Sequence, residues 1–382
     1  MKDISDLWGN WAVKSTSGKL LTMLRDGGAQ SRADLARGIC VSASVLTKLA
    51  AASISRGLVL EADTTAPSPM GRPPSLLAFN PSGAYVIGAN IGYGRISVAL
   101  VDSALNVQQT ASANFDQTKT TVDDMIDLVS KISNRLIEDS QLPRTRIAGV
   151  GVGVPGKVDA AKRSNLYSKL ERSGQAVPFA DRIEQRLALP VVLEHNASAI
   201  ALAEAIYGAG AGNASVLHIY MRSGLGAGLV HFRNGEANSP GPIEIGHVVV
   251  EPHGLTCVCG TRGCLEARFS EPALLSALQL DHVPEEGLIA AARANAEVWA
   301  LPYEQFVQTL ATSITLLGPD LILLGGHLGE APQEFIDQLK SDLTPRLMRQ
   351  FEGVRIERAH LVPDAGALGA ACVALEKYVF EG

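Results

Sequence analysis

The sequence predicts a small N-terminal domain of three short helices and a β-hairpin over residues 1–80, followed by a two-lobed α/β body over residues 81–382. Apolar stripes at helical spacing, each closed by glycine, occupy residues 19–57. From Tyr85 onward, strand-like apolar runs alternate with helical patterns, as in α/β domains. With 46% hydrophobic and 19% charged residues, the chain can build large cores and is not disordered overall.

The three N-terminal helices are marked by their ends. The first carries a leucine stripe over Leu20–Leu24 and is followed by two glycines. The second is short, because Ser31 is placed to cap it in a capping box with Asp34, and a glycine soon closes it. Ser42 is a good N-cap for the third helix, which we expect to run to about Arg56. Three of its apolar residues are expected to face inward: Val45, Leu46 and Leu49.

Two apolar runs, Leu58–Leu60 and Leu76–Phe79, follow the third helix and flank the polar, proline-rich stretch Thr64–Pro74. They predict two strands joined by a loop, which is a wing. Three short helices with a wing are typical of a winged helix-turn-helix, whose third helix enters the DNA major groove. The alternative is a small helical cap with no role in nucleic-acid binding.

Candidate DNA-binding side chains lie on the helices and in the wing loop. Hydroxyl and ammonium groups near the start of the third helix can reach base edges and phosphates. In the loop, Gly71 permits close backbone approach, and Arg72 suits a narrow, electronegative minor groove. The alternative for Arg72 is a solvated linker arginine. The predicted DNA-binding residues are Arg32, Ser42, Ser44, Thr47, Lys48 and Arg72.

The charge distribution suits an anionic partner at one end of the chain. Residues 1–80 hold nine Lys/Arg and six Asp/Glu, a net +3, whereas the whole chain carries −6. The sequence contains neither a signal-peptide pattern nor an apolar run of membrane-spanning length. We therefore expect a cytoplasmic protein with no membrane partner.

Three of the five cysteines fall within eight residues, and a histidine precedes them. In a reducing compartment such a cluster favours a metal over disulfides, and redox-active thiols are the alternative. One imidazole and three thiolates complete a tetrahedral structural zinc site with no open position. The predicted ligands in this zinc loop, residues 247–264, are His247, Cys257, Cys259 and Cys264. The isolated Cys40 and Cys372 are expected to be buried structural thiols.

The body repeats an α/β pattern twice. Tyr85–Ala89 and Arg95–Val101 are expected to pair as strands, Thr121–Glu138 to form an amphipathic helix, and Ile147–Val154 to be a buried strand. A second set of predicted strands comprises Ser215–Tyr220, Gly226–Phe232 and Leu321–Leu324. Two such sets predict two lobes around a cleft near residues 194–198.

The segment Glu244–Glu266 resembles the signature of the ROK family, which groups sugar kinases with sugar-responsive repressors. Four further segments occur in the family's order: Gly151–Gly156, Leu193–Ser198, Arg222–Gly228 and Leu324–Gly326. The N-terminal segment, with its Gly-Arg-Pro element, resembles the repressor branch. The fold that this resemblance implies for the body is the ribonuclease H-like fold of actin-like ATPases and hexokinases.

The resemblance also implies a sugar site. His247 would use one ring nitrogen for zinc and the other for the sugar, so the metal would fix the orientation of the ring. Carboxylates and imidazole suit vicinal hydroxyls, which both donate and accept hydrogen bonds. The residues implied as sugar-binding are Gly156, Asn196, Glu244, His247 and Glu266.

Two departures from the family's kinases indicate lost phosphoryl transfer. His195-Asn196 stands where the kinases carry Asn-Asp, and an amide cannot accept the proton of a sugar hydroxyl. Asn90 replaces the aspartate of the first phosphate loop, and Tyr93 adds bulk where the backbone would approach phosphate. We therefore expect no enzyme activity and no functional ATP or Mg²⁺ site.

These observations predict a DNA-binding transcriptional repressor of carbohydrate metabolism, controlled by a sugar or sugar derivative and acting as a homodimer or higher homo-oligomer on operator DNA. One structural zinc ion per chain is expected. The main rival is an ATP-dependent sugar kinase with an added N-terminal domain. A third reading is constitutive DNA binding with a pocket that holds nothing.

Overall fold

The computed structural model describes residues 14–62, 75–159, 163–166, 176–233, 236–239 and 241–381. These residues form two compact units. The first unit comprises residues 14–194 and 366–381, and the second comprises His195–Ala365. The chain therefore passes between the units after Glu194 and again after Ala365.

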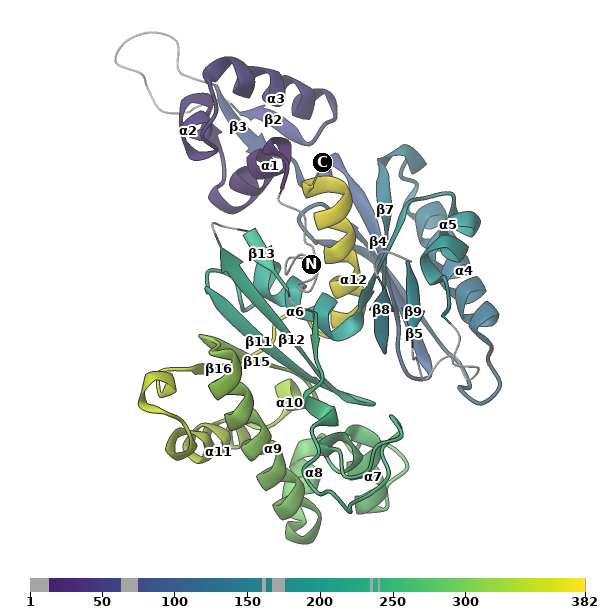
Figure 1. Ribbon diagram of the computed structural model, residues 1–382. Helices are drawn as coiled ribbons and strands as arrows, with labels where there is room; N and C mark the ends of the chain where they lie inside the picture. Colours follow the sequence, from purple (N-terminus) through teal and green to yellow (C-terminus); the bar gives the residue numbers. More distant parts are fainter. Residues whose placement is uncertain are drawn as a thin grey trace, which may run out of the picture. The chain divides into compact units, whose positions relative to one another are not determined.

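The N-terminal part of the first unit, called the head below, comprises three helices and a three-stranded antiparallel sheet of order β1-β3-β2 (Figure 1). The three predicted helices and the two predicted strands are confirmed, and the sheet contains a further short strand, β1, that the sequence analysis did not predict. The elements are α1 (Thr16–Gly27), β1 (Gln30–Ser31), α2 (Arg32–Gly38), α3 (Ala43–Ser55), β2 (Val59–Ala62) and β3 (Leu76–Phe79).

Side-chain caps set the ends of these helices. The Asp34 amide donates to Ser31 Oγ at 3.2 Å, as the capping box predicted. The Val45 amide donates to Ser42 Oγ at 3.3 Å, which starts α3. The helices bury a leucine-rich core against the sheet, in which these residues are almost fully enclosed: Leu20, Leu21, Leu24, Leu35, Leu46 and Leu77.

Two predictions about the head are wrong. Val45 does not face inward; its side chain is 43% exposed, because the buried face of α3 is made by Leu46, Ala50 and Ser53. Cys40 is exposed rather than buried, because it lies in the turn between α2 and α3 with a positive φ of 58°. Cys372 is buried, as predicted.

The rest of the first unit contains a five-stranded sheet of order β10-β7-β4-β5-β6. Helices α4 and α5 cover one face and α12 the other (Figure 1). Strands β8 (Lys157–Asp159) and β9 (Ser164–Leu166) form a separate hairpin. The other elements are β4 (Tyr85–Ile91), β5 (Arg95–Asp102), β6 (Val107–Asn114), α4 (Val122–Ser140), β7 (Ile147–Val154), α5 (Phe179–Leu187), β10 (Val191–His195) and α12 (Ala365–Leu375).

Glycines in the central strands let α12 pack directly on the sheet. A Cβ added at Gly88 of β4 would lie 2.0 Å from the Ala367 carbonyl oxygen. One added at Gly151 of β7 would lie 1.8 Å from that of Ala370. Because real Cβ atoms do not approach so closely, both strand positions require glycine. The helix contributes small residues to the same contact and is held close to two strands at once.

The second unit contains a mixed sheet of order β13-β12-β11-β15-β16, with β14 paired to β12. All three strands predicted for this lobe are confirmed. The strands are β11 (Ser215–Met221), β12 (Leu225–Arg233), β13 (Glu236–Asn238), β14 (Pro242–Ile243), β15 (Leu321–Gly326) and β16 (Arg355–Arg358). The helices are α6 (Asn196–Tyr207), α7 (Glu271–Leu278), α8 (Leu288–Ala294), α9 (Ala296–Leu317), α10 (His327–Glu330) and α11 (Gln333–Leu343).

Among the described residues, no single helix is long and apolar enough to cross a membrane. Helices α2 and α3 taken together meet the length and composition criteria, but they are bent by 108° at their junction.

Candidate functional site

A cluster of one imidazole and three thiols lies in the second unit. The ligand atoms of His247, Cys257, Cys259 and Cys264 all fall within 4.8 Å of one another. His247 Nδ1 lies 3.7 Å from Cys257 Sγ, and the Sγ atoms of Cys259 and Cys264 are also 3.7 Å apart. Four soft and borderline donors at this separation match the shell of a tetrahedral metal ion. The cluster can therefore hold a metal.

Local backbone geometry brings the thiols of this loop together. Isolated bridges pair Val249 with Cys264 and Thr256 with Arg262, so the chain folds back on itself. Gly263 has a positive φ of 80°, and a Cβ there would lie 1.7 Å from the Glu251 carbonyl oxygen. Burial raises the pKa of the Cys264 thiol to about 12. A bound cation opposes this effect, because it stabilises the thiolate form.

The 3₁₀-helix η4 (Ile245–His247) brings two of the predicted sugar ligands together. His247 directs Nδ1 toward Cys257, and its Nε2 lies 4.0 Å from Glu244 Oε2. The two ring nitrogens thus face different partners, one in the thiol cluster and one outside it. The Glu244 side chain is more than half exposed, so its carboxylate is available to a ligand.

Glu266 has a second role that the sequence did not indicate. It lies on the 3₁₀-helix η5 (Leu265–Ala267), which packs against η4. Its buried carboxylate accepts a hydrogen bond from the Leu225 amide at 3.0 Å. A Cβ at Gly224 would approach Glu266 Oε2 to 2.7 Å. The carboxylate therefore holds the glycine loop before β12, whatever else it binds.

The predicted cleft residues at 194–198 lie where the chain leaves β10 and enters α6. Asn196 is the first residue of α6. His195 caps this helix, because its Nδ1 accepts from the Ala197 amide at 3.2 Å. Burial lowers the pKa of His195 to about 4, so the ring is neutral at pH 7 and keeps the lone pair that the cap needs.

Asn90 and Gly156, two further positions that the sequence analysis singled out in the body, belong to the first unit. Asn90 lies near the end of β4, against the start of α12, where a Cβ at Gly366 would lie 2.6 Å from its Cγ. Its buried Oδ1 has no hydrogen-bond partner among the described residues. Gly156 follows β7 with a positive φ of 85°, a conformation that favours glycine. The structure places Asn196, Glu244, His247 and Glu266 in the second unit.

A charged cluster that sequence reasoning missed lies beside the second glycine loop. Arg222 Nη1 lies 3.1 Å from His327 Nδ1 and 3.1 Å from Glu330 Oε2. His327 Nε2 lies 2.6 Å from Glu271 Oε2. The signals were present, since Arg222 opens one glycine motif and His327 follows another, but only the fold joins β11 to β15 and brings them together.

The titration of this cluster gives a pH-dependent contribution to stability. Burial lowers the pKa of His327, but hydrogen bonds with Glu271 and Glu330 outweigh burial and raise it above its ordinary value of 6.5. The hydrogen bond from His327, aided by Arg222, lowers the pKa of Glu330 to about 2. The histidine contribution is complete below pH 6.5 and is lost as the pH rises through the raised pKa. The Glu330 contribution is complete above pH 4.5 and is lost as the pH falls toward 2.

Replacing His327 with glutamine is therefore expected to lower the free energy of unfolding by about 2 kcal/mol between pH 5 and 6, because charge-assisted hydrogen bonds are lost. The difference between wild type and variant is expected to shrink at alkaline pH, where His327 is neutral in both folded and unfolded chains. Urea unfolding of both proteins at several pH values measures this difference. A difference that stays constant from pH 5 to pH 9 would contradict the assignment.

The predicted DNA-binding residues of α3 lie near its start and are exposed. Ser42 caps the helix, and its Oγ lies 3.0 Å from Ser44 Oγ. The Thr47 hydroxyl donates to the Ala43 carbonyl at 2.8 Å, and Lys48 is exposed. Arg32 donates to Ser75 Oγ at 2.8 Å and pairs with Glu61, so it links α2 to β2 and to the residue before β3. Arg72 lies outside the described residues.

A buried ion-pair cluster, called the head anchor below, joins the head to the C-terminal helix. Glu376 lies 2.8 Å from Lys14 Nζ and 3.2 Å from Arg25 Nη1. The three side chains are at most 10% exposed. Both cations also lie over the ring of Phe380, and a Cβ at Gly18 would lie 1.6 Å from the Phe380 carbonyl oxygen. The head therefore packs tightly against the end of the chain.

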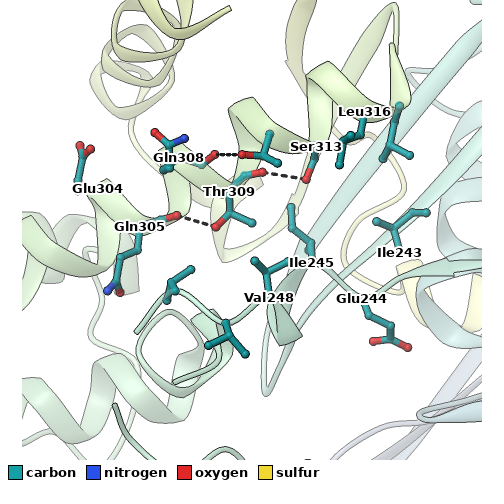
Figure 2. A pocket seen from close by; sticks show the side chains of 14 residues that line it. Ile243, Glu244, Ile245, Val248, Glu304, Gln305, Gln308, Thr309, Ser313 and Leu316 are labelled. Carbon is teal, nitrogen blue, oxygen red and sulfur yellow. Dashed lines mark hydrogen bonds between the residues drawn. The ribbon is translucent and has the colours of Figure 1, made fainter. Parts of the chain in front are cut away.

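A pocket of about 560 Å³ lies in the second unit, between α9 and the segment Ile243–Val250 (Figure 2). Polar side chains of α9 form one wall, and aliphatic side chains of the segment form the other. Glu244 points away from α9 in this view. The segment that carries Glu244 and His247 therefore forms one wall of the pocket, and Glu244 is among the lining residues.

Comparison with known proteins identifies similar chains. The model of the ROK family matches residues 86–377. A glucokinase of Thermotoga maritima is 29% identical over 76% of this chain and 98% of its own length. A xylose repressor of Bacillus spizizenii is 26% identical over 81% of this chain and 82% of its own. The crystal structure of a ROK-family transcriptional regulator, described as a homologue of E. coli Mlc, covers 96% of both chains with a TM-score of 0.79 at 20% identity.

Proposed function

The chain belongs to the ROK family, and we propose that it is a sugar-responsive transcriptional repressor of carbohydrate-metabolism genes. In this proposal residues 1–80 form a winged helix-turn-helix domain that binds operator DNA. Residues 81–382 form a sensor body with the actin-like fold of the family's sugar kinases, and this body binds a sugar or sugar derivative. The protein acts in the cytoplasm.

One combination of features carries this proposal: an N-terminal head of three helices and a small sheet, joined to a kinase-like body with Asn196 at the position of the kinases' general base. The glucokinase match leaves about a quarter of this chain uncovered, whereas the regulator structure spans both head and body. An amide keeps the hydrogen bonds that recognise a hydroxyl but cannot take its proton. Loss of such a base costs on the order of 10²- to 10⁴-fold in rate.

The sugar site of the proposal comprises Asn196, Glu244, His247 and Glu266, with Gly156 contributing its backbone. A zinc ion held by His247 and the three cysteines would fix the imidazole, as His247 Nδ1 already faces Cys257 Sγ at 3.7 Å. The exposed carboxylate of Glu244 and the outer nitrogen of His247 would then meet adjacent sugar hydroxyls. The zinc ion is structural, one per chain.

Regulation requires that the sugar bind one state of the protein better than the other. We propose that sugar binding changes the closure of the two lobes and thereby the spacing of the heads in a homodimer or higher homo-oligomer. A two-fold operator matches such an assembly, because each head reads one half-site.

The rival function is an ATP-dependent sugar kinase with an added head. The relative from Thermotoga maritima, a glucokinase, supports that reading through its identity. Asn90 and Asn196 oppose it, because neither amide replaces a carboxylate in organising Mg²⁺ or accepting a proton. Sugar-dependent ATP turnover of even a few per second by the zinc-loaded protein would favour the kinase.

The test is a screen of sugars by differential scanning fluorimetry, followed by measurement of binding to selected DNA with and without the stabilising sugar. A stabilising sugar that changes DNA affinity supports the proposal, and stable DNA binding that ignores every sugar contradicts it.

In the same assays, Arg72→Ala is expected to weaken DNA binding about tenfold through loss of a minor-groove contact, with sugar-induced stabilisation unchanged. Unaltered DNA affinity would remove Arg72 from the interface.

A further inference from the structure

The outward face of α3 presents one large apolar side chain near its start. Val45 is the third residue of the helix and is 43% exposed, while its neighbour Leu46 is buried. A β-branched residue is a weak helix former, and an exposed one adds no packing to the head. Neither helix formation nor the core of the head explains a valine at this position.

The hydroxyl groups beside Val45 already have partners within the helix. Ser42 Oγ accepts from the Val45 amide at 3.3 Å and lies 3.0 Å from Ser44 Oγ. Thr47 Oγ1 donates to the Ala43 carbonyl at 2.8 Å. These bonds reduce the capacity of all three hydroxyls to distinguish bases. The side chains of this turn that extend beyond them are Val45 and the exposed Lys48.

We propose that Val45 is a specificity-determining residue that reads the 5-methyl group of a thymine in the major groove, in each half-site of the operator. This inference rests on the proposed function and deepens it. The N-terminal turn of a recognition helix contacts base edges, and an apolar side chain there discriminates thymine through its methyl group. Lys48, one turn further along the same face, supplies the charge that suits the phosphate backbone.

The methyl contact also fits the residues that follow along the exposed face of α3. Ala51 and Ala52 are exposed and small. A helix with short side chains on its outward face can lie deep in the groove. Val45 then reaches base edges, whereas a long side chain would be needed on a helix held further out.

The experiment uses the full-length, zinc-loaded chain. A preferred duplex is selected from a pool of random DNA, and each thymine is then replaced singly by deoxyuridine, which removes only the methyl group. At one thymine per half-site, the replacement is expected to weaken binding to wild type about fourfold. Val45→Ala is expected to weaken binding to the thymine duplex by about four- to fifteenfold and to bind both duplexes equally. Val45→Thr keeps one methyl group, so its affinity for the thymine duplex is expected to lie between those of wild type and Val45→Ala.

Leu301→Ala on α9 is the matched control, because Leu301 is also an exposed aliphatic residue, at 49%, but lies in the other unit. It is expected to keep the wild-type preference for thymine. Equal penalties for wild type and Val45→Ala at every uracil position would overturn this inference and leave the proposed function intact. A chain that enriches no sequence from the pool overturns both.

Discussion

Replacing Cys259 with serine is expected to release the metal from the second unit and to abolish the sugar response. The thiolate is one of four donors that lie within 4.8 Å of one another, and no other described residue joins the cluster. Loss of a supporting contact outside a metal shell already costs about 10- to 100-fold in affinity, so loss of a ligand is expected to cost more than 100-fold. Metal content by mass spectrometry and the sugar-induced shift in melting temperature measure the two effects.

The head provides an internal comparison in that experiment, because it belongs to the first unit and contains none of the four ligands. Its helices are expected to stay folded in Cys259→Ser, as judged by hydrogen exchange. Cys40→Ser is the matched control, since Cys40 is an exposed thiol outside the cluster, and it should retain metal and sugar response. A normal sugar response in metal-free Cys259→Ser would show that the metal does not organise the sugar site.

The second large effect is expected at the head anchor. Glu376→Gln removes the carboxylate that Lys14 and Arg25 share. Arg25 keeps its pair with Asp26 at 2.6 Å, whereas Lys14 keeps a hydrogen bond to the neutral Thr22 hydroxyl at 2.9 Å and carries the larger penalty. Removing one partner of a buried ion pair costs about 3–5 kcal/mol, because the remaining charge stays desolvated. We expect the head to detach at a lower temperature than in wild type, with faster hydrogen exchange in α1 and weaker DNA binding.

Sugar-induced stabilisation is expected to persist in Glu376→Gln, since Glu376 lies in the first unit and outside the proposed sugar site. Glu357→Gln is the matched control. It breaks an exposed pair with Arg355, 3.1 Å apart, and such pairs contribute only about 0–1 kcal/mol. If the head detaches at the same temperature in Glu376→Gln and Glu357→Gln, it is held by apolar packing, and the ion pairs of the head anchor add no stability.

Features that depend on local spacing could be predicted from the sequence. The helix caps at Ser31 and Ser42 could be predicted because each hydroxyl accepts a hydrogen bond from the backbone amide only three residues further along the chain. The four residues of the cluster are His247, Cys257, Cys259 and Cys264. They converge because they are close together in the sequence and because glycines allow the short loop between them to turn. The strands around Ile147–Val154 and Leu321–Gly326 were evident because both faces of a central strand are buried, which leaves a continuous apolar run.

The burial of two residues was predicted wrongly, because the sequence pattern alone did not show which side of their segment faces the core. Val45, Leu46 and Leu49 are all apolar, so periodicity over one short helix did not reveal which of them faces solvent. Cys40 lies among apolar residues in the sequence but in a turn in space. In both cases burial depends on the elements that pack against the segment, and those come from other parts of the chain.

The sequence by itself determined the members of the histidine–cysteine cluster and the amides at Asn90 and Asn196, because each is a matter of residue identity and short spacing. Only the tertiary structure revealed the contact of Glu376 with Lys14 and Arg25, more than 350 residues away, and the cluster around Arg222 and His327. Charged groups carry no periodic signal of their partners. Their pairing depends on which strands and helices the hydrophobic cores bring together, and that is a property of the whole fold.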